Sequence, residues 1–209
     1  MLQSEPARTD EHFTKIIIHA ETRDGSLFDL VKDHTILKKI ILDGCPCRLS
    51  EESHNFSEIN DFCNGLNILP CRVLFQGVEM MKSVPVSVGP LQRKKIETRI
   101  GKQDVVLAEA WYCTNKNNKL IESPFAGIRI FRDGNPIGLP NLYNGKEYPD
   151  SEITVTRPDL LNWHIGEVHI LHEELRPDAS GEGLRASELF RIFREELRKF
   201  YSDFSVVLF

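Results

Sequence analysis

The sequence has no long apolar run: its longest unbroken apolar stretches, such as 105–108 and 206–209, are four residues long. A helix that crosses a membrane needs about 18 or more apolar residues, so the sequence predicts no membrane span and no membrane partner. The opening MLQSEPARTD has no apolar core, which argues against a secretory signal. We therefore expect a cytoplasmic protein.

The sequence also has no surplus of positive charge. It holds 26 lysines and arginines against 31 aspartates and glutamates, for a net charge of −5. Nucleic-acid binders usually carry a basic surplus, so the balance argues against a nucleic-acid partner. A single candidate basic patch has no interleaved aromatic residues for base stacking, so we interpret it as a solvated loop face. It comprises Arg93, Lys94, Lys95, Arg99, Lys102, Lys116 and Lys119.

Apolar residues make up 41% of the chain and charged residues 27%, which excludes a wholly disordered protein. Cysteine is scarce and odd in number, which excludes a simple disulfide framework. A zinc site built from Cys45, Cys47, Cys63 and Cys71 needs two close pairs. Only Cys45 and Cys47 are close, with the stiff Pro46 between them, so the sequence favours free, partly buried thiols. The role of these four cysteines stays open.

The usual catalytic motifs are missing as well. The sequence contains neither the His-Glu-x-x-His zinc motif nor the Gly-x-Ser-x-Gly elbow of hydrolases. Three histidines stand near three glutamates, but His169 and His172 point to opposite faces if one strand runs through both. We therefore expect strand and loop-edge histidines, no metal site, and no catalytic residue that the motifs identify. The residues concerned are His164, His169, His172, Glu167, Glu173 and Glu174.

The apolar pattern predicts an α+β fold, with a mixed sheet backed by helices on one face. Phe190, Phe193, Leu197, Phe200 and Phe204 recur at spacings of three and four, which indicates a C-terminal amphipathic helix over 187–204. An earlier helix is expected over 27–41, either continuous or broken near 33–35, and ended by Gly44. Residues 45–72 have no clear period, and 93–97 are expected to be charged surface. Strands are predicted at 13–20, 71–75, 84–88, 104–113, 127–131 and 163–171.

Three segments carry a family resemblance. The first is the strand at 13–20 with the following LFDLVKDHTILKKII, and the second is AGIRIFRDGNPIG at 126–138. The third and most specific is IGEVHILHEELRPDASGEGLRASELFRIFREELRKF at 165–200. Together they resemble the middle, or transducer, domain of the GHKL ATPases, most closely the HtpG-like heat-shock chaperones and more distantly the MutL-like repair proteins.

The resemblance implies a four-stranded, helix-backed transducer fold shared with one small-subunit ribosomal protein. It divides the chain into a disordered tail (1–11), the last strand of an ATPase module with its connecting helix (12–44), and the transducer domain (45–209). Such a domain relays the nucleotide state of a neighbouring ATP-binding module to a partner or client protein, and a dimer is possible. The family's ATP-binding patterns do not occur in these residues, so the resemblance implies ATP and magnesium for the complete protein and no cofactor for this chain alone. The chain is then a fragment, a split subunit or a truncated product.

In this family an arginine of the transducer domain reaches the γ-phosphate, where a fixed cation offsets developing negative charge. The matching position here is Gly181, after a loop that reads Leu-Arg-Pro-Asp at 175–178 in place of the family's Leu-x-Pro-Asn. Arg185, expected one helical turn after Gly181, is the first candidate for a γ-phosphate contact in trans, and Arg176 is the second. The alternative is a stand-alone protein-binding adaptor that kept the transducer fold and lost the ATPase function.

Overall fold

The structure is a computed structural model that describes residues 2–5, 15–18, 34–68, 70–117, 119–121, 125–142 and 158–206. The chain divides into two compact units, residues 1–41 and 42–209. In the first unit, strand β1 (Leu2–Glu5) pairs antiparallel with β2 (Lys15–Ile18). The strand β1 lies within the segment predicted as a disordered tail. Helix α2 (His34–Gly44) ends at Gly44 as predicted, and residues 27–33 of the expected helix lie outside the described residues.

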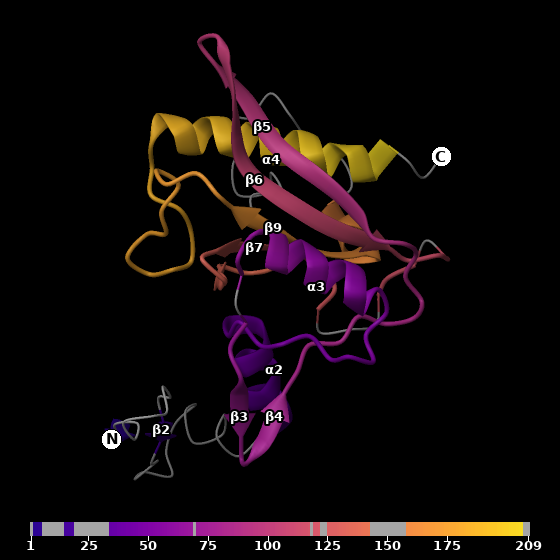
Figure 1. Ribbon diagram of the computed structural model, residues 1–209, viewed down its shortest axis with the longest axis vertical. Helices are drawn as coiled ribbons and strands as arrows, with labels where there is room; N and C mark the ends of the chain where they lie inside the picture. The colour runs from indigo at the N-terminus through magenta and orange to yellow at the C-terminus, as the bar shows by residue number, and fades with distance from the viewer. Residues whose placement is uncertain are drawn as a thin grey trace. The chain divides into compact units, whose positions relative to one another are not determined.

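The second unit is built on a five-stranded mixed sheet, which confirms the predicted α+β class (Figure 1). The strand order is β5-β6-β9-β7-β8, and β7 and β9 run parallel while the other pairs are antiparallel. The sheet has one strand more than the family resemblance implied, and the charged segment 93–97, expected as surface, belongs to a long edge strand. The strands are β5 (Gln92–Ile100), β6 (Gln103–Thr114), β7 (Gly127–Arg132), β8 (Asn135–Ile137) and β9 (His164–Ile170).

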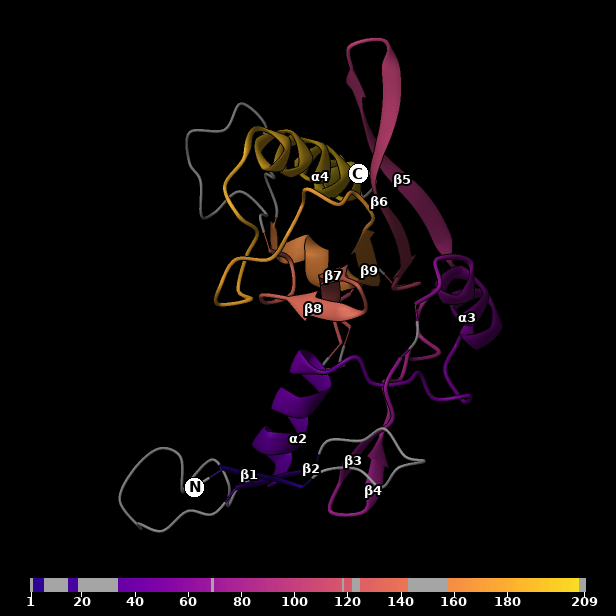
Figure 2. The ribbon, with the colours of Figure 1, turned by 60° about the vertical axis from the view of Figure 1, so that its left-hand side comes forward.

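Helix α4 (Glu188–Val206) covers one face of this sheet (Figure 2). Ser187 caps its start, since the Ser187 Oγ accepts a hydrogen bond of 3.0 Å from the backbone N–H of Phe190. The predicted apolar stripe is buried against alternate residues of the central strands, so it is the main core of the unit. The core residues are Phe190, Phe193, Leu197, Phe200 and Phe204 from α4, with Ile128, Ile130, Val168 and Ile170 from β7 and β9.

Helix α3 (Phe56–Gly65) packs on the opposite face, so the prediction that the helices lie on one face is wrong (Figures 1 and 2). The reason is that both faces of the central strands are apolar. Val168 and Ile170 face α4, while Ile165 lies in a second core with Ile59 and Phe62 of α3. Trp111 and Cys113 of β6 belong to this second core.

The segment between α3 and the sheet differs from its prediction in one place. A strand was expected at 84–88, but Pro85 and a turn interrupt it, and only Val88 forms an isolated bridge, with Asn115. The strand pair instead lies earlier, where β3 (Val73–Phe75) and β4 (Val78–Met80) form an antiparallel hairpin. The short 3-10 helix η1 (Pro158–Trp163) leads into β9. None of the helices in the described ranges has the length and apolar character needed to cross a membrane.

His164 should make the unit acid-sensitive. Its ring is buried, stacks on Phe204 at 4.3 Å between centroids, and shares a 3.0 Å hydrogen bond between Nδ1 and Thr114 Oγ1. Burial lowers the pKa of His164 from 6.5 to about 4. Below pH 6.5 the His164 imidazole is therefore protonated in the unfolded chain but not in the folded chain. Protonation favours the unfolded chain, so the free energy of unfolding decreases as the pH falls from 6.5 to 4.

We expect a loss of about 2–3 kcal/mol over this range. The measurement is urea unfolding of the wild type and of His164→Gln at pH 7 and pH 4.5. The variant should lose less stability than the wild type on acidification, because glutamine does not titrate. Equal losses in the two proteins would contradict the assignment.

Candidate functional site: a cavity with a buried carboxylate

A cavity of about 680 Å³ opens on the α3 side of the sheet. Its lining comes from segments that are far apart in the sequence: the loop after α2, helix α3, the loop after β4, and the strands β6, β7 and β9. Most of the lining is apolar or aromatic, with charged groups at a few positions, which is typical of ligand pockets. The chemically important lining residues are Cys63, Lys82, Trp111, Phe131, Glu167 and His169.

The sheet positions the two acid-base residues of the cavity. Residues two apart on a strand share a face, so Glu167 and His169 of β9 both point to the α3 side, opposite the α4 core. Trp111 lies directly across from Glu167 in the β6–β9 pairing. Lys82 is brought to the same place by backbone hydrogen bonds of 2.8 Å between its segment and residues Arg48 and Ser50.

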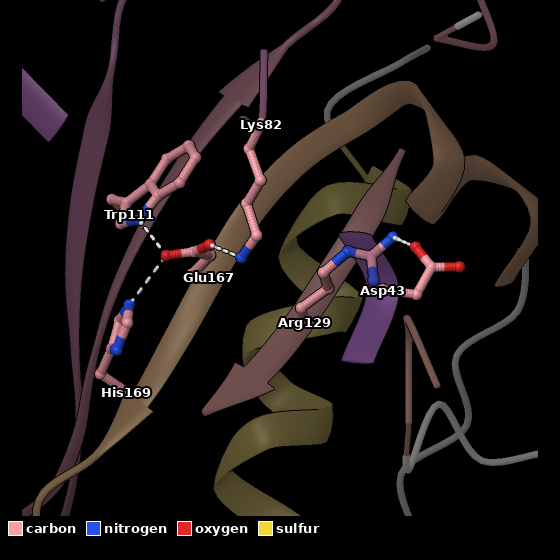
Figure 3. Close-up of polar contacts among 6 residues, drawn as sticks. All are labelled: Asp43, Lys82, Trp111, Arg129, Glu167 and His169. Atoms are coloured by element: carbon pink, nitrogen blue, oxygen red, sulfur yellow. Dashed lines mark hydrogen bonds and ion pairs between the residues drawn. The ribbon is translucent and has the colours of Figure 1, made fainter. Parts of the chain in front are cut away.

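The carboxylate of Glu167 lines the cavity and contacts three side chains (Figure 3). Its Oε1 lies 3.4 Å from Lys82 Nζ. Its Oε2 accepts hydrogen bonds from Trp111 Nε1 at 3.2 Å and from His169 Nε2 at 3.0 Å. Burial by itself raises the pKa of Glu167, but the Lys82 charge and the hydrogen bonds from His169 and Trp111 outweigh it and lower the pKa to about 2. The carboxylate is therefore ionised at neutral pH.

Aromatic rings hold the histidine and the lysine in place. The His169 ring stacks on Phe131 at 5.2 Å between centroids with an interplanar angle of 18°, and Phe62 of α3 lies tilted against it at 5.8 Å. The Lys82 ammonium lies 4.6 Å from the centroid of the same Phe131 ring, a distance at which a cation is attracted to an aromatic face. The polar groups of the cavity therefore stand in fixed positions.

A second ion pair, between the buried Arg129 of the neighbouring strand and the half-buried Asp43, lies next to the first. Arg129 pairs in register with Glu167 across β7 and β9, and its Nη2 contacts Asp43 Oδ1 at 2.9 Å (Figure 3). The Arg129 side chain is only 7% exposed. The residue belongs to the Gly-Ile-Arg segment that carried part of the family resemblance, and the pair lies within the second unit, which begins at Leu42.

The sequence interpretation of the histidines and glutamates was right for some residues and incomplete for others. His164 is a buried strand histidine, and His172 lies in the loop after β9. Glu167 and His169, however, form a hydrogen-bonded pair in the cavity. The alternation Glu-x-His on a strand with apolar neighbours was the signal that could have found this pair, because it places both side chains on one face.

The four cysteines considered for zinc do not converge. Cys47 and Cys71 are neighbours through an isolated parallel bridge. Cys47 and Cys63 both line the cavity, but only Cys63 groups there with other potential ligands. In the part of the chain that the structure describes, one group of potential metal ligands has its ligand atoms within 4.8 Å of one another: Cys63, Glu167 and His169. Burial, and then the charge of Glu167, raise the pKa of the Cys63 thiol to about 12.

The candidate phosphate-contacting arginines lie elsewhere, on the loop between β9 and α4. This loop is anchored in the α4 core by Leu175 and Leu184. Arg176 and Arg185 follow these leucines directly, and the backbone N–H of Arg185 donates to the Arg176 carbonyl at 2.9 Å. The prediction that Arg185 lies one helical turn after Gly181 is wrong, because helix α4 begins only at Glu188. The two arginines are exposed neighbours on a narrow turn.

The predicted basic patch is largely a strand, not a loop face. Residues 93–99 belong to β5, where successive side chains point to opposite faces. Lys94 pairs with Asp203 at 2.9 Å and Lys95 with Glu109 at 3.5 Å, while Arg93 Nη2 donates to the Glu58 carbonyl. The positive charges are therefore divided between two faces and partly neutralised.

No protein-family model matches this chain, and no curated protein matches it with significant similarity.

Proposed function

We propose that this chain is a non-catalytic transducer domain of a GHKL-type, HtpG-like chaperone ATPase, which relays the nucleotide state of an ATP-binding module to a partner or client. The observation that carries the proposal is the loop between β9 and α4. It holds two arginines on a hydrogen-bonded turn, directly between the central strand and the main helix of the unit. A movement of this loop is coupled to the core through Leu175 and Leu184.

The loop keeps both arginines ready for an anionic partner. Arg176 Nε donates to the Glu173 carbonyl at 3.0 Å, and Arg185 Nε donates to the Pro177 carbonyl at 3.1 Å. Among the described residues, the Nη atoms of these two arginines have no hydrogen bond or ion pair. Two exposed guanidinium groups with free outer nitrogens suit the terminal phosphate of a nucleotide held by another module.

Gly181 shows why the cation is expected from these arginines. Asp178 organises the turn, since its Oδ1 accepts hydrogen bonds from the backbone N–H groups of Ser180 and Gly181 at 3.0 and 2.8 Å. The turn requires a positive φ of 74° at Gly181, a conformation that L side chains rarely adopt. An arginine at 181 would strain the turn, so the charge is supplied by its neighbours Arg176 and Arg185.

The test supplies the missing module in trans. The 209-residue chain alone should not bind Mg-ATP in isothermal titration calorimetry, and it should accelerate ATP hydrolysis by a separate HtpG-type ATP-binding module. Arg185→Gln should reduce the acceleration by roughly tenfold or more, as expected for loss of a phosphate-contacting arginine. Arg191→Gln is the matched control, because that arginine is bound to Glu188 and Glu195 on the outer face of α4. Tight Mg-ATP binding by this chain alone would refute the proposal.

A stand-alone protein-binding adaptor is the second candidate, and Gly181 favours it, because the family's phosphate-contacting arginine is absent there. The two functions differ in their genetic context and in the effect of the arginines. An ATP-binding module encoded next to this chain supports the transducer, whereas an adaptor needs none. For an adaptor, Arg185→Gln leaves ATP hydrolysis by any added module unchanged.

A further inference from the structure

We propose that Cys63, Glu167 and His169 form a mononuclear binding site for a zinc-type divalent transition metal, with its remaining coordination position open to the cavity. The site joins helix α3, which carries Cys63, to strand β9, which carries the other two residues. This inference does not depend on the proposed transducer function. It differs from the expectation drawn from the sequence, which was that the chain has no metal site.

The distances and donor types fit such an ion. The Sγ, carboxylate oxygen and imidazole nitrogen lie within 4.8 Å of one another, and the oxygen and nitrogen are 3.0 Å apart. Ligand atoms around one tetrahedral zinc ion are roughly 3–4 Å apart, given Zn–S and Zn–N lengths of about 2.3 and 2.0 Å. A set of one sulfur, one nitrogen and one oxygen selects zinc-like metals over magnesium or calcium, which prefer oxygen alone.

The two carboxylate oxygens of Glu167 have different partners, so only one of them is placed to bind the metal. Oε1 faces the ammonium of Lys82, so Oε2 is the oxygen that shares the cluster with His169. The Trp111 N–H donates to the same Oε2 and fixes the orientation of the carboxylate (Figure 3). Outer hydrogen bonds of this kind hold metal ligands in place in known sites. Phe62 and Phe131 pack on the His169 ring and restrict its rotation.

Metal binding at this site releases one proton. The S–H bond of Cys63 breaks as the Sγ–metal bond forms, and the proton passes to solvent. Coordination through Nε2 requires the imidazole tautomer that carries its proton on Nδ1, so the proton shared between Nε2 and the Glu167 carboxylate moves to Nδ1 as the Nε2–metal bond forms. Two negative ligands then face a 2+ ion, with Lys82 adjacent. Three protein ligands and one open position are the arrangement of zinc sites that also bind water or a ligand.

The experiment uses the full chain freed of metal and titrated with Co²⁺ alone, followed by Zn²⁺ alone. We expect one equivalent of Co²⁺ to give tetrahedral visible bands and a thiolate-to-cobalt charge-transfer band, and Zn²⁺ to displace it. Saturating Zn²⁺ at about a hundredfold excess over the Kd should raise the Tm by roughly 5–10 °C. Cys63→Ser should abolish the charge-transfer band and weaken Zn²⁺ binding at least about tenfold.

Cys71→Ser is the matched control, because Cys71 is an exposed thiol outside the cluster. It should keep both the band and the affinity. Loss of the band in Cys71→Ser with retention in Cys63→Ser would place the metal on the other thiols and overturn the proposal, as would binding with no thiolate band. Alkylation of the wild type, mapped by mass spectrometry, gives a test that needs no variant: Zn²⁺ should protect Cys63 and leave Cys71 reactive, and the reverse pattern refutes the site.

Discussion

Replacing Gly166 by alanine is expected to destabilise the sheet unit by about 3 kcal/mol or more. Gly166 lies in β9 between β6 and β7, opposite Tyr112 on one side and Ile128 on the other. A Cβ at this position would overlap the carbonyl oxygen of Trp111 and come within 2.7 Å of the Tyr112 Cβ and 2.9 Å of its Cα. The Trp111 oxygen and the Tyr112 Cα are backbone atoms, and the Tyr112 Cβ is bonded directly to the backbone. Only a shift of the whole strand therefore relieves the overlap.

Urea unfolding of Gly166→Ala measures this effect, and Gly65→Ala is the control. Gly65, at the end of α3, has helical backbone and open space where an alanine Cβ would lie. The same substitution there should change stability by less than about 1 kcal/mol, because alanine loses less backbone entropy than glycine on folding. Similar losses in the two variants would show that the close approach of β6 and β9 is not what limits position 166.

Lys82→Met is expected to cost about 3 kcal/mol, the lower end of the range for breaking a buried ion pair. Lys82 and Glu167 are only 12% and 15% exposed, so removal of the ammonium leaves a buried carboxylate without its cation. The hydrogen bonds from Trp111 and His169 remain, which limits the loss. Stability should be measured by chemical unfolding of Lys82→Met, Glu167→Gln and the double variant. The double variant should recover at least about half of the Lys82→Met loss.

The stabilisation by the ionised Glu167 carboxylate depends on pH, and the direction of this dependence can be predicted. Since the pKa of Glu167 is about 2 in the folded chain and near 4.5 otherwise, its stabilisation is present above pH 4.5 and is lost as the pH falls toward 2. In Lys82→Met the pKa rises, so acid should remove less stability from the variant than from the wild type. Lys94→Met is the control, because its partner Asp203 is 59% exposed and such surface pairs contribute less than about 1 kcal/mol. A loss as large at Lys94 would contradict the role of burial.

The sequence predicts the elements whose apolar pattern is long or dense. Helix α4 has five stripe residues over nearly its whole length, and β6 is a continuous strand of 12 residues, so both were found. Helix α3 buries only Ile59 and Phe62, too few to establish a period. Strand β5 was missed because Ile96 is its one buried residue, and the charges around it are typical of a surface loop.

Only the cavity residues that lie close together in the sequence could be predicted. Glu167 and His169 are two residues apart on one strand, so their shared face follows from the strand itself. Lys82 and Trp111 are 85 and 56 residues away from Glu167 in the sequence, and Cys63 lies on the helix that the pattern did not reveal. Their convergence depends on the strand order and on which face α3 covers, neither of which a single sequence encodes in local spacing.

The two outer strands of the sheet have a consequence for how this protein behaves at high concentration. Strand β5 carries exposed Arg93, Lys94 and Lys95 at one edge, and its register shifts at Ile96/Glu97. Strand β8, at the other edge, has only three residues, and Pro136 removes one of their N–H groups. An added strand from another copy would meet charged side chains and a bulge at one edge and a short, donor-poor segment at the other. The sheet is therefore built to end at these strands, which protects the chain against edge-to-edge aggregation.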